Sequence, residues 1–169
     1  MNKNLILTGM MGAGKSTIGS LLAKVLNFKF IDMDSLIEEK EKMTIKEIFA
    51  SKGEAYFRNI EKKITLNNIQ DSKKVIALGG GAFINPIIRN EVLLKTSSFW
   101  IDIKPDTLIK RTNKSNKRPL IDNKNLKRDI YRIYEERKDF YGLADYKINC
   151  NRLNKIQIVN KIVEIYENL

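Results

Sequence analysis

The sequence predicts an α/β fold, a three-layer α/β/α sandwich in which helices cover both faces of a five-stranded parallel sheet. Two observations lead to this prediction. Short apolar runs of strand length alternate along the chain with longer stretches whose apolar residues recur at helical spacing. A glycine-rich turn joins the first apolar run to the first helical stretch, as in a strand–turn–helix unit. Because parallel strands need crossover helices between them, this alternation indicates a parallel sheet.

The turn between the first strand and the first helix has a recognisable pattern. Residues 5–8 end an apolar run, residues 15–26 have helical spacing, and residues 9–17 between them, GMMGAGKST, fit G-x-x-x-x-G-K-[ST]. The glycines allow backbone conformations that gather consecutive N–H groups around a polyphosphate. The helix N-terminus that follows favours anions as well. The sequence therefore predicts a phosphate-binding loop (P-loop) and a nucleotide ligand.

The side chains of this loop have separate expected roles. Lys15 supplies a positive charge for the β and γ phosphates, and the Ser16 hydroxyl is placed to ligate Mg²⁺. The ATP-binding positions expected in the loop are Gly12, Ala13, Gly14, Lys15, Ser16 and Thr17.

Length and hydropathy limit the class of protein. The 169 residues suit one domain, residues 1–169, with a complete hydrophobic core. No segment approaches the roughly 18 apolar residues that a membrane-spanning helix needs, and the N-terminus has no signal-peptide pattern. We expect a cytoplasmic protein with no membrane partner.

Charge and cysteine content exclude other classes. Cys150 is the single cysteine, so an intramolecular disulfide is excluded, and the absence of histidine argues against a zinc site. Any metal should be a hard cation held by oxygen. The net charge of +11 comes from lysines scattered without a long basic run. We therefore assign it to solvated surface plus an anion site, and expect no nucleic-acid partner.

The second strand is expected at residues 28–31, followed by Asp32-Met33-Asp34 and a helix over residues 35–42. Carboxylates at the carboxyl end of a strand lie at the ligand-binding edge of an α/β sheet. In an extended segment Asp32 and Asp34 would point the same way, toward Mg²⁺ or a substrate hydroxyl. Alternatively, Asp34 serves only as the N-cap of the helix. The spacing leaves both interpretations open.

A long helical stretch follows. Thr44 and Glu47 have the spacing of a capping box, the helix runs to residue 51, and Gly53 interrupts it before it resumes over residues 54–69. Arg58 stands three residues before Glu61, so the carboxylate can orient the guanidinium. A surface ion pair is the alternative interpretation of these two residues.

A third strand over residues 75–78 ends in Gly79-Gly80-Gly81. Three glycines cost backbone entropy, which suggests a backbone closely approached by a ligand, although a structural turn is the alternative. The elements expected after it are a helix from Pro86, a strand at 99–103, a helix at 105–111, a polar basic loop at 113–127, a helix at 129–141, a strand at 146–149 and a helix at 156–166. Mobile basic loops beside phosphate sites cover the reaction in kinases.

The chain resembles the shikimate kinases over almost its whole length. The matching segments, in order, are GMMGAGKST at 9–17, FIDMD with Asp32 and Asp34, GEAYFRNIE at 53–61, LGGGA at 78–82, RPL at 118–120 and ERKDFY at 136–141. The resemblance implies a P-loop NTPase of the nucleoside-monophosphate-kinase type, with strand order 2-3-1-4-5. It also implies ATP-dependent phosphorylation of the 3-hydroxyl of shikimate, giving shikimate 3-phosphate and ADP, in chorismate and aromatic amino-acid biosynthesis.

The resemblance further implies roles for individual residues. Asp34 would accept hydrogen bonds from ring hydroxyls, and Arg58 and Arg137 would bind the carboxylate with the fork geometry that lysine lacks. The substrate-binding set is Asp34, Arg58, Gly79, Gly80, Gly81 and Arg137, and the catalytic set is Lys15, Asp34 and Arg118.

The remaining implied positions concern ATP. Ser16 and Asp32 would hold one Mg²⁺ per subunit, and Arg118 would reach the phosphates from a mobile lid at about residues 113–124. Arg111 and Arg152 would contact adenine. The expected partners are shikimate and ATP, and we expect a monomer. The rival interpretations are another P-loop small-molecule kinase, such as a gluconate kinase or a nucleoside monophosphate kinase, and a non-catalytic nucleotide-binding protein.

Overall fold

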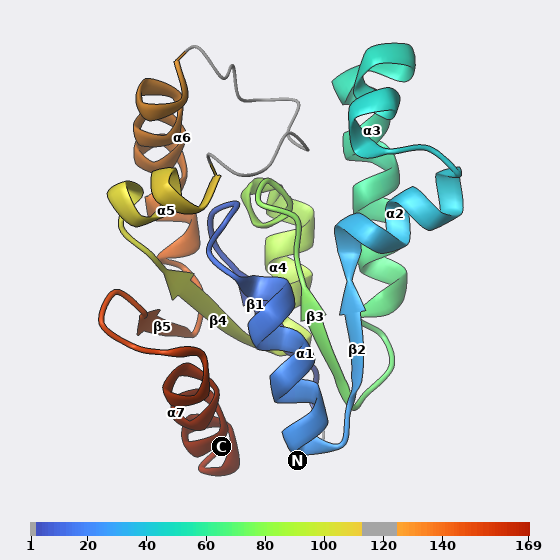
Figure 1. Ribbon diagram of the computed structural model, residues 1–169. Helices are drawn as coiled ribbons and strands as arrows, with labels where there is room; N and C mark the ends of the chain where they lie inside the picture. The colour runs from blue at the N-terminus through green and yellow to red at the C-terminus, as the bar shows by residue number, and fades with distance from the viewer. Residues whose placement is uncertain (1–2, 113–124) are drawn as a thin grey trace.

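A computed structural model describes residues 3–112 and 125–169, and its centre is a parallel sheet (Figure 1). The strands are β1 (Leu5–Thr8), β2 (Lys29–Asp32), β3 (Lys74–Ala77), β4 (Ser97–Asp102) and β5 (Tyr146–Asn149). They form one five-stranded sheet in the order β2-β3-β1-β4-β5, and each pairing is parallel. The predicted fold class and strand order are both confirmed.

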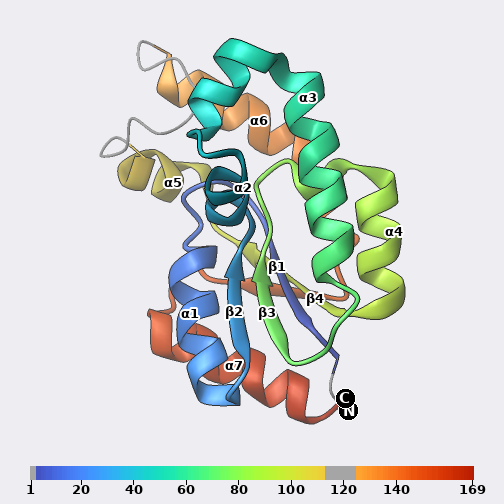
Figure 2. The same cartoon turned by 90° about the vertical axis from the view of Figure 1, so that its right-hand side faces the viewer.

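Helices cover both faces of the sheet. They are α1 (Lys15–Leu26), α2 (Met33–Glu41), α3 (Ile45–Asn68), the 3₁₀ helix η1 (Ala82–Ile84), α4 (Pro86–Lys95), α5 (Pro105–Thr112), α6 (Leu126–Tyr141) and α7 (Lys155–Glu167). Figure 2 shows α1 and α7 on one side of the sheet and α3 and α4 on the other. This is the three-layer arrangement that the alternation of patterns predicts.

The central strands are buried on both faces. Leu5, Ile6 and Leu7 of β1 have no exposed surface, and all residues of β3 and β4 are buried, whereas β2 and β5 are partly exposed at the edges. Burial on both faces explains why the central strands read as continuous apolar runs. From β1 the chain continues to β2, and from β3 it crosses to β4 on the other side of β1. The carboxyl ends of β1 and β3 therefore flank the point where the strand order reverses, which is where α/β sheets bind ligands.

Two helix starts differ from the prediction. Helix α2 begins at Met33, not Ser35, because the Asp32 carboxylate caps it by accepting a hydrogen bond from the Ser35 N–H at 3.2 Å. The alternative role of Asp34 as the N-cap is therefore wrong. Helix α6 begins at Leu126, three residues earlier than predicted, so the polar loop is shorter at its carboxyl end. The first turn of α6 is mostly polar, so it lacks the apolar spacing by which a helix is predicted.

The long helical stretch follows the prediction. Thr44 and Glu47 form both hydrogen bonds of a capping box at the start of α3. Gly53 has φ +82° and ψ +168°, so it breaks α3 into two segments where the sequence predicts an interruption. The lid predicted at 113–124, with Arg118, lies outside the described residues. No helix in the described part of the chain is long and apolar enough to cross a membrane.

Candidate active site

The P-loop connects β1 to α1. Gly9, Gly12 and Gly14 have φ of +133°, +77° and +93°, a region open chiefly to glycine, so the pattern of glycines follows from the backbone path. Helix α1 starts at Lys15 with neither a side-chain cap nor an acidic residue in its first turn. Its first N–H groups and its positive dipole end are therefore directed at the loop, where they favour an anion.

Lys15 is held inside the loop. Its ammonium donates hydrogen bonds to the carbonyl oxygens of Gly9 at 2.8 Å and Met10 at 3.0 Å, and the side chain is buried. These contacts hold the charge at the mouth of the loop. Phosphate oxygens bound by the loop would lie within reach of it.

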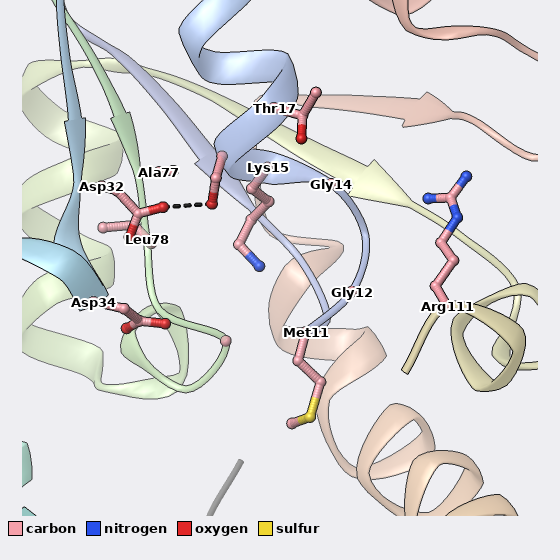
Figure 3. Close-up of a pocket in the computed structure, with 12 residues that line it drawn as sticks. Met11, Gly12, Gly14, Lys15, Thr17, Asp32, Asp34, Ala77, Leu78 and Arg111 are labelled. Atoms are coloured by element: carbon pink, nitrogen blue, oxygen red, sulfur yellow. Dashed lines mark hydrogen bonds between the residues drawn. The ribbon is translucent and has the colours of Figure 1, made fainter. Parts of the chain in front are cut away.

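A cavity of about 310 Å³ opens between the P-loop and the ends of β2 and β3. Its lining includes Lys15, Ser16, Asp32, Asp34, Gly80 and Arg111. Figure 3 shows Asp32 and Asp34 on one side of the P-loop and Arg111 on the other. The cavity thus has an acidic side and a basic side, and the loop runs between them.

The two aspartates both face this cavity, although the reason differs from the expected one. The segment is not extended through Asp34, because Asp32 ends β2 and Asp34 lies in the first turn of α2. Asp32 also accepts a hydrogen bond from the Ser16 hydroxyl (Figure 3). A hydroxyl and a carboxylate are thus brought together by α1 and β2, and both are oxygen donors of the kind that Mg²⁺ prefers.

Asp34 is partly exposed to the cavity but largely surrounded by protein. Desolvation raises the pKa of its carboxyl group above the ordinary 3.8, the Lys15 ammonium opposes this, and the Asp32 carboxylate adds to it. A carboxylate poised in this way accepts hydrogen bonds strongly, because burial leaves its charge poorly solvated.

Arg58 and Glu61 form an ion pair that is buried on the glutamate side and 28% exposed on the arginine side. Arg58 Nη1 lies 2.8 Å from Glu61 Oε2, and the Glu61 side chain is only 2% exposed. The other edge of the guanidinium contacts Glu54 at 3.2 Å. Burial raises the pKa of Glu61 while Arg58 opposes the shift. The surface alternative thus describes only the outer half of this pair, and the two glutamates hold the plane of the Arg58 guanidinium.

The glycine segment, Gly79–Gly81, is required by side chains of the protein itself. A Cβ on Gly79 would stand 2.6 Å from Asp34 Oδ1 and 2.8 Å from Glu61 Oε1, and a Cβ on Gly81 would stand 2.6 Å from Arg58 Nη1. Gly80 has ordinary clearance, but its carbonyl oxygen accepts a hydrogen bond from Arg137 Nη1 at 3.1 Å. Gly79 and Gly81 thus leave room for the side chains of Asp34, Glu61 and Arg58, and Gly80 offers its carbonyl to Arg137.

The family model for shikimate kinase matches residues 11–167. The chain belongs to the shikimate kinase family. It is therefore an ATP-using transferase of the P-loop kinases, in agreement with the resemblance drawn from the motifs.

Individual members of the shikimate kinase family are similar over nearly their full lengths. The shikimate kinase of Sulfurihydrogenibium sp. (strain YO3AOP1) is 42% identical over 163 residues, covering 95% of this chain and 96% of the relative. The shikimate kinase of Persephonella marina is 36% identical, covering 95% of this chain and 97% of the relative. A solved shikimate kinase from Acinetobacter baumannii in complex with shikimate superposes with a TM-score of 0.95 at 29% identity, covering 99% of this chain and 94% of that one.

The rival family is more distant. A gluconokinase from Sinorhizobium meliloti 1021 superposes with a TM-score of 0.60 at 13% identity, covering 99% of this chain and 95% of that one. At this identity the likeness shows a shared fold only. The gluconate kinase alternative thus has the architecture in common with this chain but not the sequence family.

The structure gathers most residues assigned from the family resemblance. The P-loop residues Gly12, Gly14, Lys15, Ser16 and Thr17 line the cavity with Asp32, Asp34, Gly80 and Arg111. Arg58, Gly79, Gly81 and Arg137 adjoin it through their contacts with Asp34, Glu61 and Gly80. Arg111 Nη1 reaches the Ala13 carbonyl oxygen at 3.4 Å.

The structure differs from the expected site at two residues. Arg152 is exposed in the turn between β5 and α7 and is not among the residues lining the cavity, so the structure does not bring it to the others. Tyr141, which sequence reasoning left without a role, contacts the glycine segment. The available signal was its spacing, because a residue four positions after Arg137 lies on the same face of the helix.

Proposed function

We infer that the protein transfers the γ-phosphoryl group of ATP to the 3-hydroxyl of shikimate, giving shikimate 3-phosphate and ADP in chorismate and aromatic amino-acid biosynthesis. One observation carries this inference. Beside the P-loop, each of three consecutive glycines lies next to a different side chain. Asp34 lies next to Gly79, Arg137 next to Gly80 and Arg58 next to Gly81. Two guanidinium groups next to a carboxylate suit a small ring that carries both a carboxylate and hydroxyl groups.

The side chains divide the work of phosphoryl transfer. Arg58 and Arg137 bind the substrate carboxylate, and Asp34 accepts a hydrogen bond from the hydroxyl that attacks. Lys15 neutralises charge on the transferring phosphoryl group. Because this reaction depends mainly on alignment and charge neutralisation, Asp34 contributes by orienting the hydroxyl as well as by accepting its proton. The substrate-binding role of the glycine segment is to support these side chains and to expose the backbone of Gly80.

Magnesium fits the oxygen donors of the site. Ser16 and Asp32 lie within hydrogen-bond contact and face the cavity. Mg²⁺ in kinase sites is held by one or two protein oxygen donors together with substrate phosphates. We assign one Mg²⁺ per subunit to Ser16 and Asp32. When bound with ATP, the ion neutralises phosphate charge.

The adenine side of the site is assigned to Arg111, which stands across the P-loop from the aspartates (Figure 3). Arg152 would need the turn after β5 to approach it. Arg118, outside the described residues, stays a prediction as a second charge stabiliser. We further propose a single-domain, cytoplasmic monomer with no nucleic-acid or membrane partner.

The test is ADP release in a coupled assay with Mg²⁺ and shikimate, gluconate or AMP compared side by side. We expect ADP formation that depends on both Mg²⁺ and shikimate. A preference for gluconate or AMP would favour the rival kinases. ADP release that is indifferent to all three, or ATP binding without turnover, would reject the assignment.

Arg58 offers a direct test of substrate recognition. Arg58→Ala should weaken shikimate binding by about 1.5–3 kcal/mol, because the substrate carboxylate loses a charged partner and Glu61 is left buried without its cation. This corresponds to a rise of roughly tenfold to a hundredfold in the shikimate KM at saturating ATP. Arg58→Lys should recover only part of the loss, because the fork geometry is absent. An unchanged KM in Arg58→Ala would remove Arg58 from the substrate site.

A further inference from the structure

Tyr141 connects three parts of the site from one buried position. It is the last residue of α6 and has no exposed surface. Its hydroxyl donates a hydrogen bond to the Gly80 carbonyl oxygen and lies 3.8 Å from Met10 Sδ in the P-loop. Its ring lies 6.1 Å from the ring of Trp100 in β4. The side chain therefore touches the segments that follow β1 and β3 while β4 supports its ring.

The Gly80 carbonyl accepts two hydrogen bonds. One comes from Tyr141 and the other, at 3.1 Å, from Arg137 Nη1. A carbonyl oxygen has two lone pairs, so both donors are accommodated at once. Because a guanidinium is planar with its N–H groups in a fixed fork, holding one Nη1–H direction restricts the whole plane. Tyr141 and Arg137, one helical turn apart, therefore share a single acceptor that governs how Arg137 is aimed.

The hydroxyl is a dependable donor. Burial raises the pKa of Tyr141, and the Arg137 guanidinium opposes that shift only in part, through its charge and through a direct side-chain hydrogen bond to the Tyr141 hydroxyl. The group stays protonated at neutral pH. Packing against Trp100 fixes the ring, so the hydroxyl has little freedom to choose another acceptor.

A second contact restrains the same segment from its other end. Arg89 Nη1 donates to the carbonyl oxygens of Phe83 at 3.1 Å and Ile84 at 2.9 Å, just after the glycines. The Arg89 guanidinium also lies 5.3 Å from the centre of the Phe140 ring, beside Tyr141. The C-terminal turn of α6 is thus connected to both ends of the segment from Gly80 to Ile84. Arg89 thus restrains the Ile84 end of this segment, while Tyr141 and Arg137 donate to the Gly80 carbonyl at its other end.

We propose that Tyr141 is a positioning residue for the substrate carboxylate, acting by fixing the guanidinium of Arg137 both through the shared Gly80 carbonyl and through their direct side-chain hydrogen bond. This inference rests on the proposed function, in which Arg137 binds the carboxylate of shikimate. Without the hydroxyl, the carbonyl and Arg137 would sample other orientations. Binding of the carboxylate would weaken, whereas ATP binding would persist because Lys15 and the P-loop amides are unchanged.

The experiment is Tyr141→Phe, which removes the hydroxyl and keeps the ring. We expect the shikimate KM at saturating ATP to rise about three- to tenfold, the range for loss of one hydrogen bond. The ATP KM and kcat should stay within about twofold. The matched control is Tyr134→Phe on the same helix, whose hydroxyl donates to Asp102 at 3.1 Å away from the glycine segment. This control should leave the shikimate KM unchanged.

A double-mutant cycle tests whether Tyr141 acts through Arg137. The shikimate KM of Arg137→Ala should be the same with and without Tyr141→Phe, because the positioned group is already gone. Additive effects would overturn the proposal, as would an unchanged KM in Tyr141→Phe. Thermal unfolding measures whether Tyr141→Phe still folds. Loss of the folded state would overturn the proposal too, because the hydroxyl would then serve the fold. Wild-type ADP release that ignores shikimate would instead reject the proposed function.

Discussion

Asp34→Asn is expected to lower kcat by about 10²- to 10³-fold, as loss of a positioned proton acceptor usually does. The amide has nearly the same shape, so the cavity should be preserved, but it cannot take a proton from the attacking hydroxyl. The shikimate KM should change far less than kcat, because Arg58 and Arg137, the proposed partners of the substrate carboxylate, are unchanged. The measurement is steady-state kinetics at saturating ATP and Mg²⁺.

The same substitution should raise stability at neutral pH. The pKa of Asp34 is raised in the folded protein above its ordinary 3.8. Between the unfolded-state pKa and the higher folded-state pKa, the folded state therefore binds more protons than the unfolded state. The free energy of unfolding of the wild type therefore falls as pH rises through that window. Glu61 is shifted in the same direction from 4.5, so only the difference between wild type and Asp34→Asn isolates Asp34. Chemical denaturation from pH 4 to 8 measures this difference.

Asp71→Asn is the control, because Asp71 is 73% exposed and paired with Lys74 far from the cavity. It should leave kcat unchanged. A kcat for Asp34→Asn within about threefold of wild type would exclude Asp34 from the reaction. A loss of stability at neutral pH would contradict the desolvation of its carboxylate.

The second large effect is expected from Gly79→Ala. The added Cβ would stand 2.6 Å from Asp34 Oδ1 and 2.8 Å from Glu61 Oε1, which is closer than Cβ atoms come to other heavy atoms. Both carboxylates must move, and Arg58 moves with Glu61. Because misplacement by about 1 Å can cost about 10²-fold in rate, kcat/KM for shikimate should fall by about that factor. Stability should change less, because the displaced atoms are the ends of side chains.

Gly80→Ala is the matched control. At the next residue an added Cβ would meet its nearest atom, the Met11 backbone nitrogen, at 3.5 Å, an ordinary contact. This variant also keeps the carbonyl that Arg137 and Tyr141 share. Its loss of kcat/KM for shikimate should be well below that of Gly79→Ala, because the added Cβ displaces no carboxylate. Equal losses in both variants would mean that the segment requires glycine for its backbone and not for the space that Asp34 and Glu61 occupy.

Local features of this chain were predictable because their causes lie within a few residues. The P-loop pattern requires positive φ at Gly9, Gly12 and Gly14, and the structure has it. The capping box of Thr44 and Glu47 and the break at Gly53 likewise involve only neighbouring backbone groups. The alternation of strands and helices determined the fold class, because the spacing of apolar residues indicates both the type of each element and its buried face. The strand order came from the family resemblance and not from these local patterns.

The tertiary structure decided the features that depend on residues far apart in the chain. Asp32 and not Asp34 caps α2, while Asp32 also binds Ser16 from another element. Gly79 is required by Asp34 and Glu61, two side chains that no local pattern places beside it. The burial of Glu61, which makes the Arg58–Glu61 ion pair partly interior, is also invisible in a spacing of three residues. In each case the physical cause is packing between distant segments, which sets the space, the burial and the hydrogen-bond partners of a residue whose identity alone leaves them open.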